Sequence, residues 1–162
     1  MRLGILSDTH DEGARTRAAV KILQNAGAEV LIHCGDLTTA SIVATCAVLP
    51  CYFVFGNNDI HMVPVLRQAA ADHNATCLGW GGIIELAGKR IGVTHGHLNA
   101  EIRHVLNDRP DYLLSGHSHV AHDQLTGKLR RINPGALHRA REFSVAVLDL
   151  ETNLLEILPV PR

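Results

Sequence analysis

The chain has 162 residues, of which 46% are hydrophobic and 19% are charged, and its formal net charge at pH 7 is -1. This length favours one domain over residues 1–162 with a sizeable core, and the near-neutral charge argues against stable nucleic-acid binding. No apolar run approaches the roughly 20 residues needed to cross a membrane, and neither a CxxC pair nor a signal peptide is present, so we expect a cytoplasmic protein with reduced thiols.

The first part of the chain alternates strand and helix patterns. Apolar runs that end at glycine or polar residues indicate strands, and amphipathic segments between them indicate helices. We predict strands over 3–6, 30–33 and 51–55, and helices over 14–26, 41–48 and 64–71. This order implies parallel strands joined by right-handed crossovers.

The remainder of the chain carries three hairpin patterns. Each has two apolar strands around a short turn, and a helix (100–106) and a strand (112–115) lie between the first hairpin and the second. The hairpin strands are 83–86 with 90–94, 123–125 with 129–132, and 144–150 with 154–158. We predict an α/β fold with a mixed two-sheet sandwich and helices outside. An exposed apolar edge at 154–158 could support a homodimer.

Seven metal-seeking side chains follow these strands. They are Asp8, His10, Asp36, Asn57, His95, His117 and His119. Sites in open α/β sheets form outside the carboxyl ends of strands, so we expect the seven to gather at one edge. Imidazole with carboxylate or amide oxygen suits Mn, Fe, Zn or Ni.

The spacing of these residues suggests how they could share two metal ions. Asp8 and His10 are two residues apart, as are His117 and His119, so in an extended segment each pair would share one face. Asp36 is the natural bridge, since it is the only carboxylate besides Asp8 that ends a core strand. Two metals about 3.5–4 Å apart can hold a bridging hydroxide and clamp the oxygens of an in-line displacement at phosphorus.

The ordered motifs resemble those of the calcineurin-like metallophosphoesterase superfamily. They are Asp8-x-His10, Gly35-Asp36, Gly56-Asn57-x-Asp59, His95-Gly96-His97 and Gly116-His117-x-His119. The short length, the Gly-Asn-Asn-Asp form and Asn133-Pro134-Gly135 resemble its small prokaryotic YfcE-type branch. The resemblance implies a four-layer αββα sandwich, with two mixed β-sheets flanked by helices, and a dinuclear site that most often holds Mn.

The resemblance also implies roles for individual residues. One metal would be held by Asp8, His10, Asp36 and His119, and the other by Asp36, Asn57, His95 and His117. Asp36, Asn57 and His97 would be the catalytic residues, and His97 and the loop 133–135 would lie near the phosphate.

One position departs from the family pattern. Many members carry a histidine after the ligand asparagine, where it helps to protonate the leaving group, whereas this chain has Asn58, which cannot donate a proton usefully. His97 is a candidate replacement, with a phosphate contact as the alternative; His61 and His138 are candidates by position, with an ordinary surface role as the alternative. We expect Asp59 to hold its loop and His33 to satisfy backbone groups near the site.

The leading hypothesis is a metal-dependent phosphoesterase, specifically a phosphodiesterase, that acts on a small phosphate ester by attack of a metal-bridging hydroxide. No serine or cysteine nucleophile with a paired base is evident. The alternative is a non-catalytic protein-binding scaffold resembling the retromer subunit of the same fold, whose metal site is incomplete. A nuclease is disfavoured because the chain has no basic face and no additional DNA-contacting domain.

Overall fold

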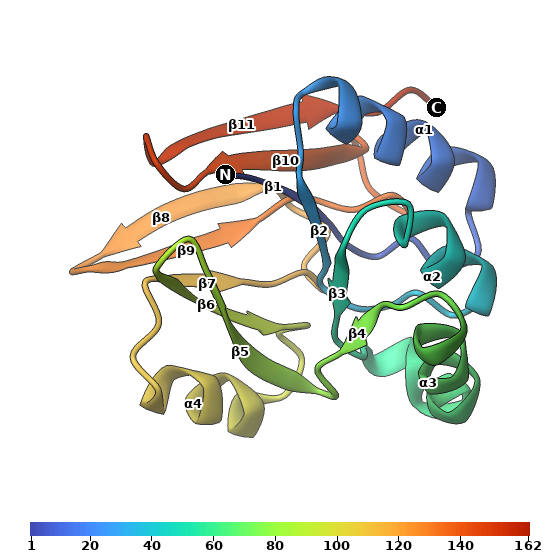
Figure 1. Ribbon diagram of the computed structural model, residues 1–162, viewed down its shortest axis with the longest axis horizontal. Helices are drawn as coiled ribbons and strands as arrows, with labels where there is room; N and C mark the ends of the chain where they lie inside the picture. The colour runs from blue at the N-terminus through green and yellow to red at the C-terminus, as the bar shows by residue number, and fades with distance from the viewer.

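Two β-sheets pack face to face and helices cover both outer sides in the computed structural model, which describes residues 1–162 (Figure 1). The predicted four-layer αββα sandwich with two mixed sheets is therefore confirmed. The predicted parallel pairing of the first strands and the three antiparallel hairpins are also present.

The first sheet has six strands in the order β11-β10-β1-β2-β3-β4. Its strands are β1 (Arg2–Leu6), β2 (Val30–His33), β3 (Cys51–Phe53), β4 (Thr76–Cys77), β10 (Ser144–Asp149) and β11 (Leu154–Pro159). β1 lies at the centre, parallel to β2 and antiparallel to β10. The carboxyl ends of β1, β2 and β3 therefore point to the same edge.

The second sheet has five strands in the order β5-β6-β7-β9-β8. Its strands are β5 (Gly81–Leu86), β6 (Lys89–Thr94), β7 (Tyr112–Leu114), β8 (His122–Thr126) and β9 (Leu129–Asn133). β6 and β7 run parallel to each other, as do β7 and β9, so their ends also share one edge.

Three helices lie on the outer side of the first sheet and one lies on the outer side of the second (Figure 1). The first three are α1 (Gly13–Asn25), α2 (Ala40–Cys46) and α3 (Val63–Asp72), and the fourth is α4 (Asn99–Asn107), which packs on β5 and β6. None of these helices combines the length and the apolar character that spanning a bilayer would require.

The chain buries two apolar cores, one on each side of the first sheet. One lies between that sheet and α1–α3, and includes Leu23, Leu31 and Phe53. The other lies between the two sheets, and includes Ile5 and Ile91, both without solvent exposure. Since β1 and β2 are covered on both faces, they are apolar at almost every position, as parallel strands usually are.

Two local elements were not predicted. The two-residue strand β4 is too short to produce an apolar pattern of its own, and it forms because it can pair with β3. A 3-10 helix, η1 (Asn57–Met62), follows β3, and β3 ends at Phe53 rather than at residue 55.

The intersheet core provides a test of this packing. Ile5→Ala should lower the free energy of unfolding by about 2–5 kcal/mol, because it removes buried methyl groups and leaves a cavity between the sheets. Leu125→Ala, at a side chain that is 67% exposed on β8, should change it by no more than about 0.5 kcal/mol. Equal losses in urea denaturation would contradict the assigned packing.

Candidate metal centre

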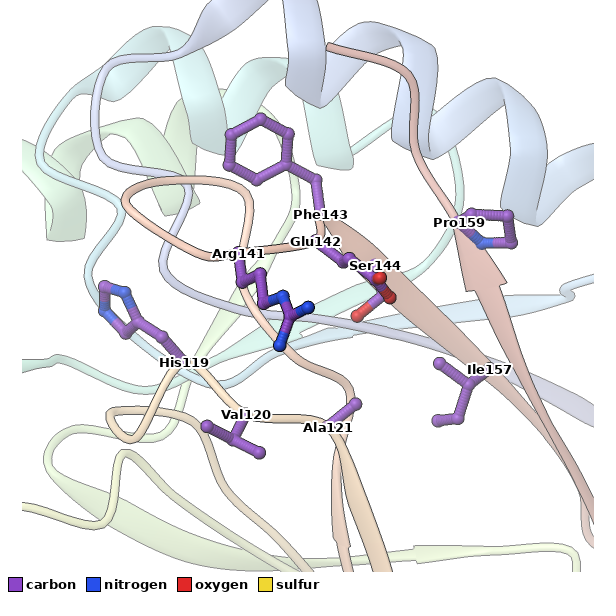
Figure 2. A pocket seen from close by; sticks show the side chains of 9 residues that line it. All are labelled: His119, Val120, Ala121, Arg141, Glu142, Phe143, Ser144, Ile157 and Pro159. Carbon is purple, nitrogen blue, oxygen red and sulfur yellow. The ribbon is translucent and has the colours of Figure 1, made fainter.

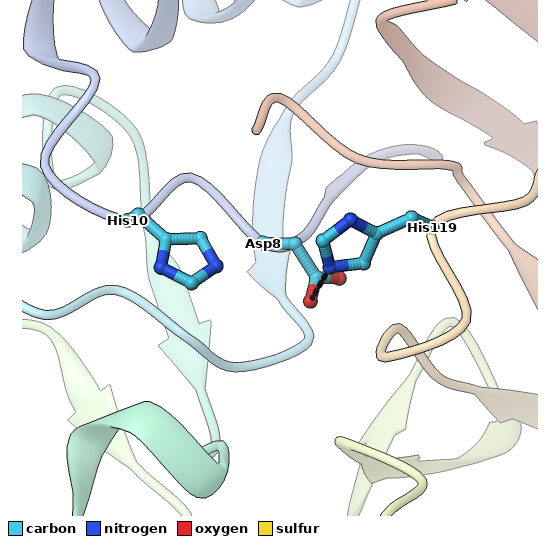
Figure 3. Close-up of side chains that lie close together, drawn as sticks. All are labelled: Asp8, His10 and His119. Carbon is cyan, nitrogen blue, oxygen red and sulfur yellow. Dashed lines mark ion pairs between the residues drawn. The ribbon is translucent and has the colours of Figure 1, made fainter. Parts of the chain in front are cut away.

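All seven predicted metal-seeking residues follow the ends of strands that meet at one edge of the sandwich. Asp8 and His10 follow β1, Asp36 follows β2, Asn57 begins η1 after β3, His95 follows β6, and His117 and His119 follow β7. Candidate ligand atoms of Asp8, His10 and His119 lie within 4.8 Å of one another, and so do those of Asp8, Asp36 and His95. Figure 3 shows the imidazoles of His10 and His119 on either side of the Asp8 carboxylate.

Asp8 and Asp36 are the hubs of this cluster. Asp8 Oδ1 lies 3.1 Å from His119 Nε2 and 3.9 Å from His95 Nε2. Asp36 Oδ2 lies 3.5 Å from His95 Nε2 and 3.7 Å from His10 Nε2. Asp36 Oδ2 thus lies close to both His10 and His95, and the bridging of two metals by Asp36 stays a prediction.

The remaining two candidate ligands approach the cluster from the side of His95. Asn57 Oδ1 lies 3.1 Å from His95 Nε2, and the ring centroids of His117 and His95 are 5.1 Å apart. His117 and His119 therefore lie in different parts of the site: His119 is next to Asp8, and His117 is next to His95.

The extended geometry expected for Asp8-x-His10 and His117-x-His119 is wrong. The φ angles are 50° and 47° at Asp8 and His10, and 67° and 57° at His117 and His119. These values lie in the left-handed region, which L-residues other than asparagine and aspartate seldom adopt. Asp36 also has a positive φ, 60°, so five of the seven candidate ligands sit on tightly turned backbone.

Glycines let the backbone approach these side chains closely. A Cβ at Gly35 would lie 2.7 Å from His95 Nδ1, and one at Gly116 would lie 2.6 Å from Asp8 Oδ2. A Cβ at Gly56 would overlap the Asp36 carboxylate. Space at the site therefore requires glycine at all three positions, and Gly35 also has a positive φ of 97°.

Asp36 is held in place by two neighbouring side chains. Asp59, which is buried, accepts hydrogen bonds from the backbone N–H groups of Gly56 at 2.7 Å, Asp36 at 2.9 Å and Thr38 at 2.8 Å. The predicted loop-holding role of Asp59 agrees with these contacts, which extend to the Asp36 loop as well. Asn58 donates to Asp36 through both its backbone N–H (2.8 Å) and its side-chain amide (2.7 Å).

Asp8 is oriented by Ser7, which is not one of the candidate ligands, and by the backbone of His117. The Ser7 hydroxyl donates to Asp8 Oδ2 at 2.6 Å, and the backbone N–H of His117 donates to the same oxygen at 3.1 Å. Oδ1 therefore faces His119. Serine immediately after a core strand is a common pattern with little information, so sequence alone gave no reason to select Ser7.

Asn133 supports the loop that carries His117 and His119. Its amide nitrogen donates to the backbone carbonyl of Gly116 at 2.8 Å, and its Oδ1 accepts from the N–H of Gly135 at 2.9 Å. With only 1% exposure, Asn133 itself is enclosed by protein. The loop 133–135 was predicted to lie near the phosphate. Within it, Asn133 is buried and supports the neighbouring loop by hydrogen bonds.

A buried histidine links the first two ligand loops. Gly35 N–H donates to His33 Nδ1 at 3.2 Å, so the proton of the neutral ring is on Nε2, which lies 3.0 Å from Thr9 Oγ1. The Thr9 hydroxyl can then donate to the Asp36 carbonyl at 3.3 Å. The predicted backbone role of His33 agrees with this chain. Burial lowers the pKa of His33 to about 3, assisted by the nearby His95.

Burial and neighbouring charges shift the pKa values of the other ionisable groups in the cluster in different directions. Burial opposes charge on both His95 and Asp36, yet their mutual hydrogen bonding outweighs it, so the pKa of His95 is raised and that of Asp36 is lowered. Burial also lowers the pKa of His10, despite the carboxylate of Asp36. These directions keep Asp36 ionised and His10 neutral, which are the forms that bind metal ions.

The hydrogen bonding and the chemistry of the side chains in this cluster suit divalent metal ions. Asp8 Oδ1 and His10 Nε2 are buried and make no hydrogen bond with any protein group. Leaving buried polar atoms without a hydrogen bond is unfavourable, so both atoms are suited to an additional ligand. The donors are imidazole nitrogens and carboxylate or amide oxygens, a set that suits first-row transition metals.

The other histidines singled out in the sequence fall into three environments. His97 lies beside the cluster, with ring centroids 5.3 Å from His95 and 6.0 Å from His117, and burial with these neighbours lowers its pKa. The His138 ring lies 4.2 Å from that of His10, and its Nδ1 lies 3.2 Å from Glu12 Oε1. The side chain of His61 is exposed on η1 and makes no hydrogen bond to a protein group.

Comparisons with known proteins show which family the chain resembles. Residues 1–153 match the model of the calcineurin-like phosphoesterase superfamily domain. The chain is 31% identical to the probable metallophosphoesterase YsnB of Bacillus subtilis, with 94% of this chain and 86% of that protein covered. It is 28% identical to the phosphodiesterase MJ0936 of Methanocaldococcus jannaschii, with 83% of each chain covered. A solved structure of an archaeal phosphodiesterase superposes with a TM-score of 0.86, at 25% identity, and covers 98% of this chain and 99% of that one.

The His33 hydrogen-bond chain predicts a pH dependence of stability. The folded protein keeps His33 neutral down to about pH 3, while the unfolded chain binds a proton below about 6.5, so stability should fall as pH falls through this window. His33→Asn retains an acceptor without the titration, and should remove up to about 1.4 kcal/mol per pH unit of that slope. Urea denaturation in chelator between pH 4 and 7 measures it; parallel curves for the two proteins would contradict the assignment.

Proposed function

The chain belongs to the calcineurin-like phosphoesterase superfamily, and from this membership we propose that it is a phosphodiesterase whose metal centre is the cluster around Asp8 and Asp36. That the chain is a metal-dependent phosphoesterase follows from the family and its relatives. The proposed site rests on one observation: two buried carboxylates and several imidazoles lie close together. Two of their buried atoms, Asp8 Oδ1 and His10 Nε2, make no hydrogen bond with the protein. The phosphodiesterase activity of its relatives supports the diester preference.

We assign the ligands of two metal ions as the motifs indicate. One ion would be held by Asp8, His10, Asp36 and His119, and the other by Asp36, Asn57, His95 and His117. Metal ions bound here would lower the pKa of water to near neutrality and neutralise charge that develops on the phosphoryl oxygens. The fixed hydrogen bonds to Asp8 and Asp36 hold both carboxylates ready for this task.

His97 and Asn58 have different roles beside the proposed metal ions. His97 lies beside His95 and His117 with a buried Nδ1 that has no partner, and its lowered pKa favours the neutral ring. This supports a role in contacting the phosphate rather than in donating a proton. Asn58 is occupied by Asp36, so its amide steadies that carboxylate where other family members have an acid.

The finer properties of the protein are also proposals. We propose Mn as the metal, with Zn, Fe or Ni as substitutes, a small phosphate ester as substrate, and one domain over residues 1–162. The near-neutral charge supports an enzyme that does not bind nucleic acid stably, and the four free cysteines support a cytoplasmic location. The exposed apolar side chain of Leu154 on edge strand β11 supports a homodimer.

A chelated and reconstituted protein provides the test of function. Hydrolysis of bis(p-nitrophenyl) phosphate should require added Mn, and should fall more than about 100-fold in Asp36→Asn, because this change weakens the carboxylate shared by both proposed metals. Glu85→Gln makes the same chemical change at an exposed residue of β5 and should leave the rate unchanged.

Two outcomes would overturn the phosphodiesterase proposal. Folded protein without activity under any of the four metals would favour the scaffold alternative. Faster hydrolysis of p-nitrophenyl phosphate than of the diester would replace a diesterase by a monoesterase at the same site.

The lack of an acid at position 58 predicts sensitivity to the leaving group. Aryl diesters should react faster than alkyl diesters, because alkoxides depend most on protonation, which typically contributes about 10²–10⁴-fold. The measurement is the dependence of kcat/KM on leaving-group pKa in a series of diesters at fixed pH and metal. A flat dependence would indicate that another group supplies the proton.

A further inference from the structure

A cavity of about 600 Å³ opens beside His119, in the space between the start of β8 and the strands β10 and β11 (Figure 2). Its apolar lining comes from Val120, Ala121, Phe143, Ile157 and Pro159. Cavities of this size and largely apolar character are typical of sites for small organic groups.

The cavity adjoins the proposed metal centre directly. His119 contributes to both, since its Nε2 lies 3.1 Å from Asp8 Oδ1 while its side chain also lines the cavity. Val120 and Ala121 follow it in the chain and continue the lining away from Asp8. A group attached to a phosphate at the metal centre could therefore enter this cavity.

Two opposite charges lie in the lining. Arg141 and Glu142 are exposed, and neither side chain makes a hydrogen bond or an ion pair with the protein. Figure 2 places the Arg141 guanidinium at the cavity, among His119, Val120 and Ala121. Because the positive charge of Arg141 is offset by Glu142, the two residues together favour a neutral group over a second anionic one.

The loop that carries Arg141 is fixed by contacts on its other side. Phe143 packs beneath the guanidinium groups of Arg15, 3.9 Å from the ring centroid, and Arg162, 5.4 Å from it. Arg162 also donates to the backbone carbonyl of Arg141 at 2.8 Å, and Arg15 donates to that of Leu137 at 2.6 Å. The backbone at Arg141 is thus held in position before any ligand binds.

We propose that this cavity binds a neutral planar ring, aryl or heterocyclic, carried by the phosphate ester substrate. The inference rests on the proposed function, since the phosphate itself would occupy the metal centre. The guanidinium plane of Arg141 can stack on the face of such a ring, and the apolar side chains of Val120 and Ile157 contact the rest of it. An ester with only a small alkyl group would leave these contacts unmade.

Phosphonates separate this inference from turnover, because their P–C bond is not hydrolysed. The experiment compares binding of phenylphosphonate and methylphosphonate to the Mn-loaded protein by calorimetry. Phenylphosphonate should bind about tenfold more tightly, since the ring adds apolar burial and stacking on Arg141.

Variants of the lining assign this preference to the cavity. Arg141→Ala should reduce the phenyl-to-methyl affinity ratio about fivefold, and Arg141→Lys should reduce it less, because an ammonium keeps the cation–π attraction but has no plane to stack on the ring. Ile157→Thr keeps a β-branched residue on β11 and should reduce the ratio about threefold. Arg103→Ala, which removes an exposed arginine of α4, should leave the ratio unchanged.

Each other result overturns a defined claim. Equal affinity for the two phosphonates in the native sequence would exclude a ring site while leaving the proposed metal centre and activity intact. A ratio preserved in Arg141→Ala would show that Arg141 makes no contact with the ring, which contradicts the stacking proposed here. Failure of both phosphonates to bind would refute the phosphate site itself, and this inference with it.

Discussion

The structure depends on bringing two buried carboxylates, Asp8 and Asp36, into one cluster of histidines. Each is at most 2% exposed, and two such charges repel each other unless positive charge compensates them. The protein provides part of this compensation through His95 and through N–H and O–H donors aimed at single carboxylate oxygens. In the proposed holoenzyme, metal ions would supply the rest of the positive charge. The two buried carboxylates would therefore both attract the metal ions and hold them where they activate water.

The sandwich meets this requirement by dividing the work between sheets and loops. Strands of both sheets end at one edge, so their covered apolar faces fix where each loop begins. Buried polar residues then fix how the loops turn. Asp59 holds the loop of Asp36, Asn133 holds that of His117, and His33 joins the loops of Thr9 and Asp36. None of the three is a proposed ligand, yet each supports one.

Much of this arrangement could be predicted from sequence, because it follows from periodicity and strand order. The strand 30–33 has the expected bounds, and the set from Asp8 to His119 gathers at one edge as the parallel strands require. The turns could not be predicted in the same way. Positive φ at His10 or His119 depends on contacts between loops far apart in the chain, and the role of Ser7 depends on one rotamer. The strand β4 likewise exists only through pairing with β3.

The left-handed backbone at His10, His117 and His119 has an evolutionary consequence. Such conformations cost about 1–2 kcal/mol at each residue with a side chain, and glycine avoids that cost. Selection for catalysis therefore acts against the stability of the loops that perform it. A lineage released from that selection would gain stability by replacing these histidines with glycine one at a time, while the sheets beneath stayed intact. This provides a physical route by which a hydrolase of this architecture can become a protein that only binds partners.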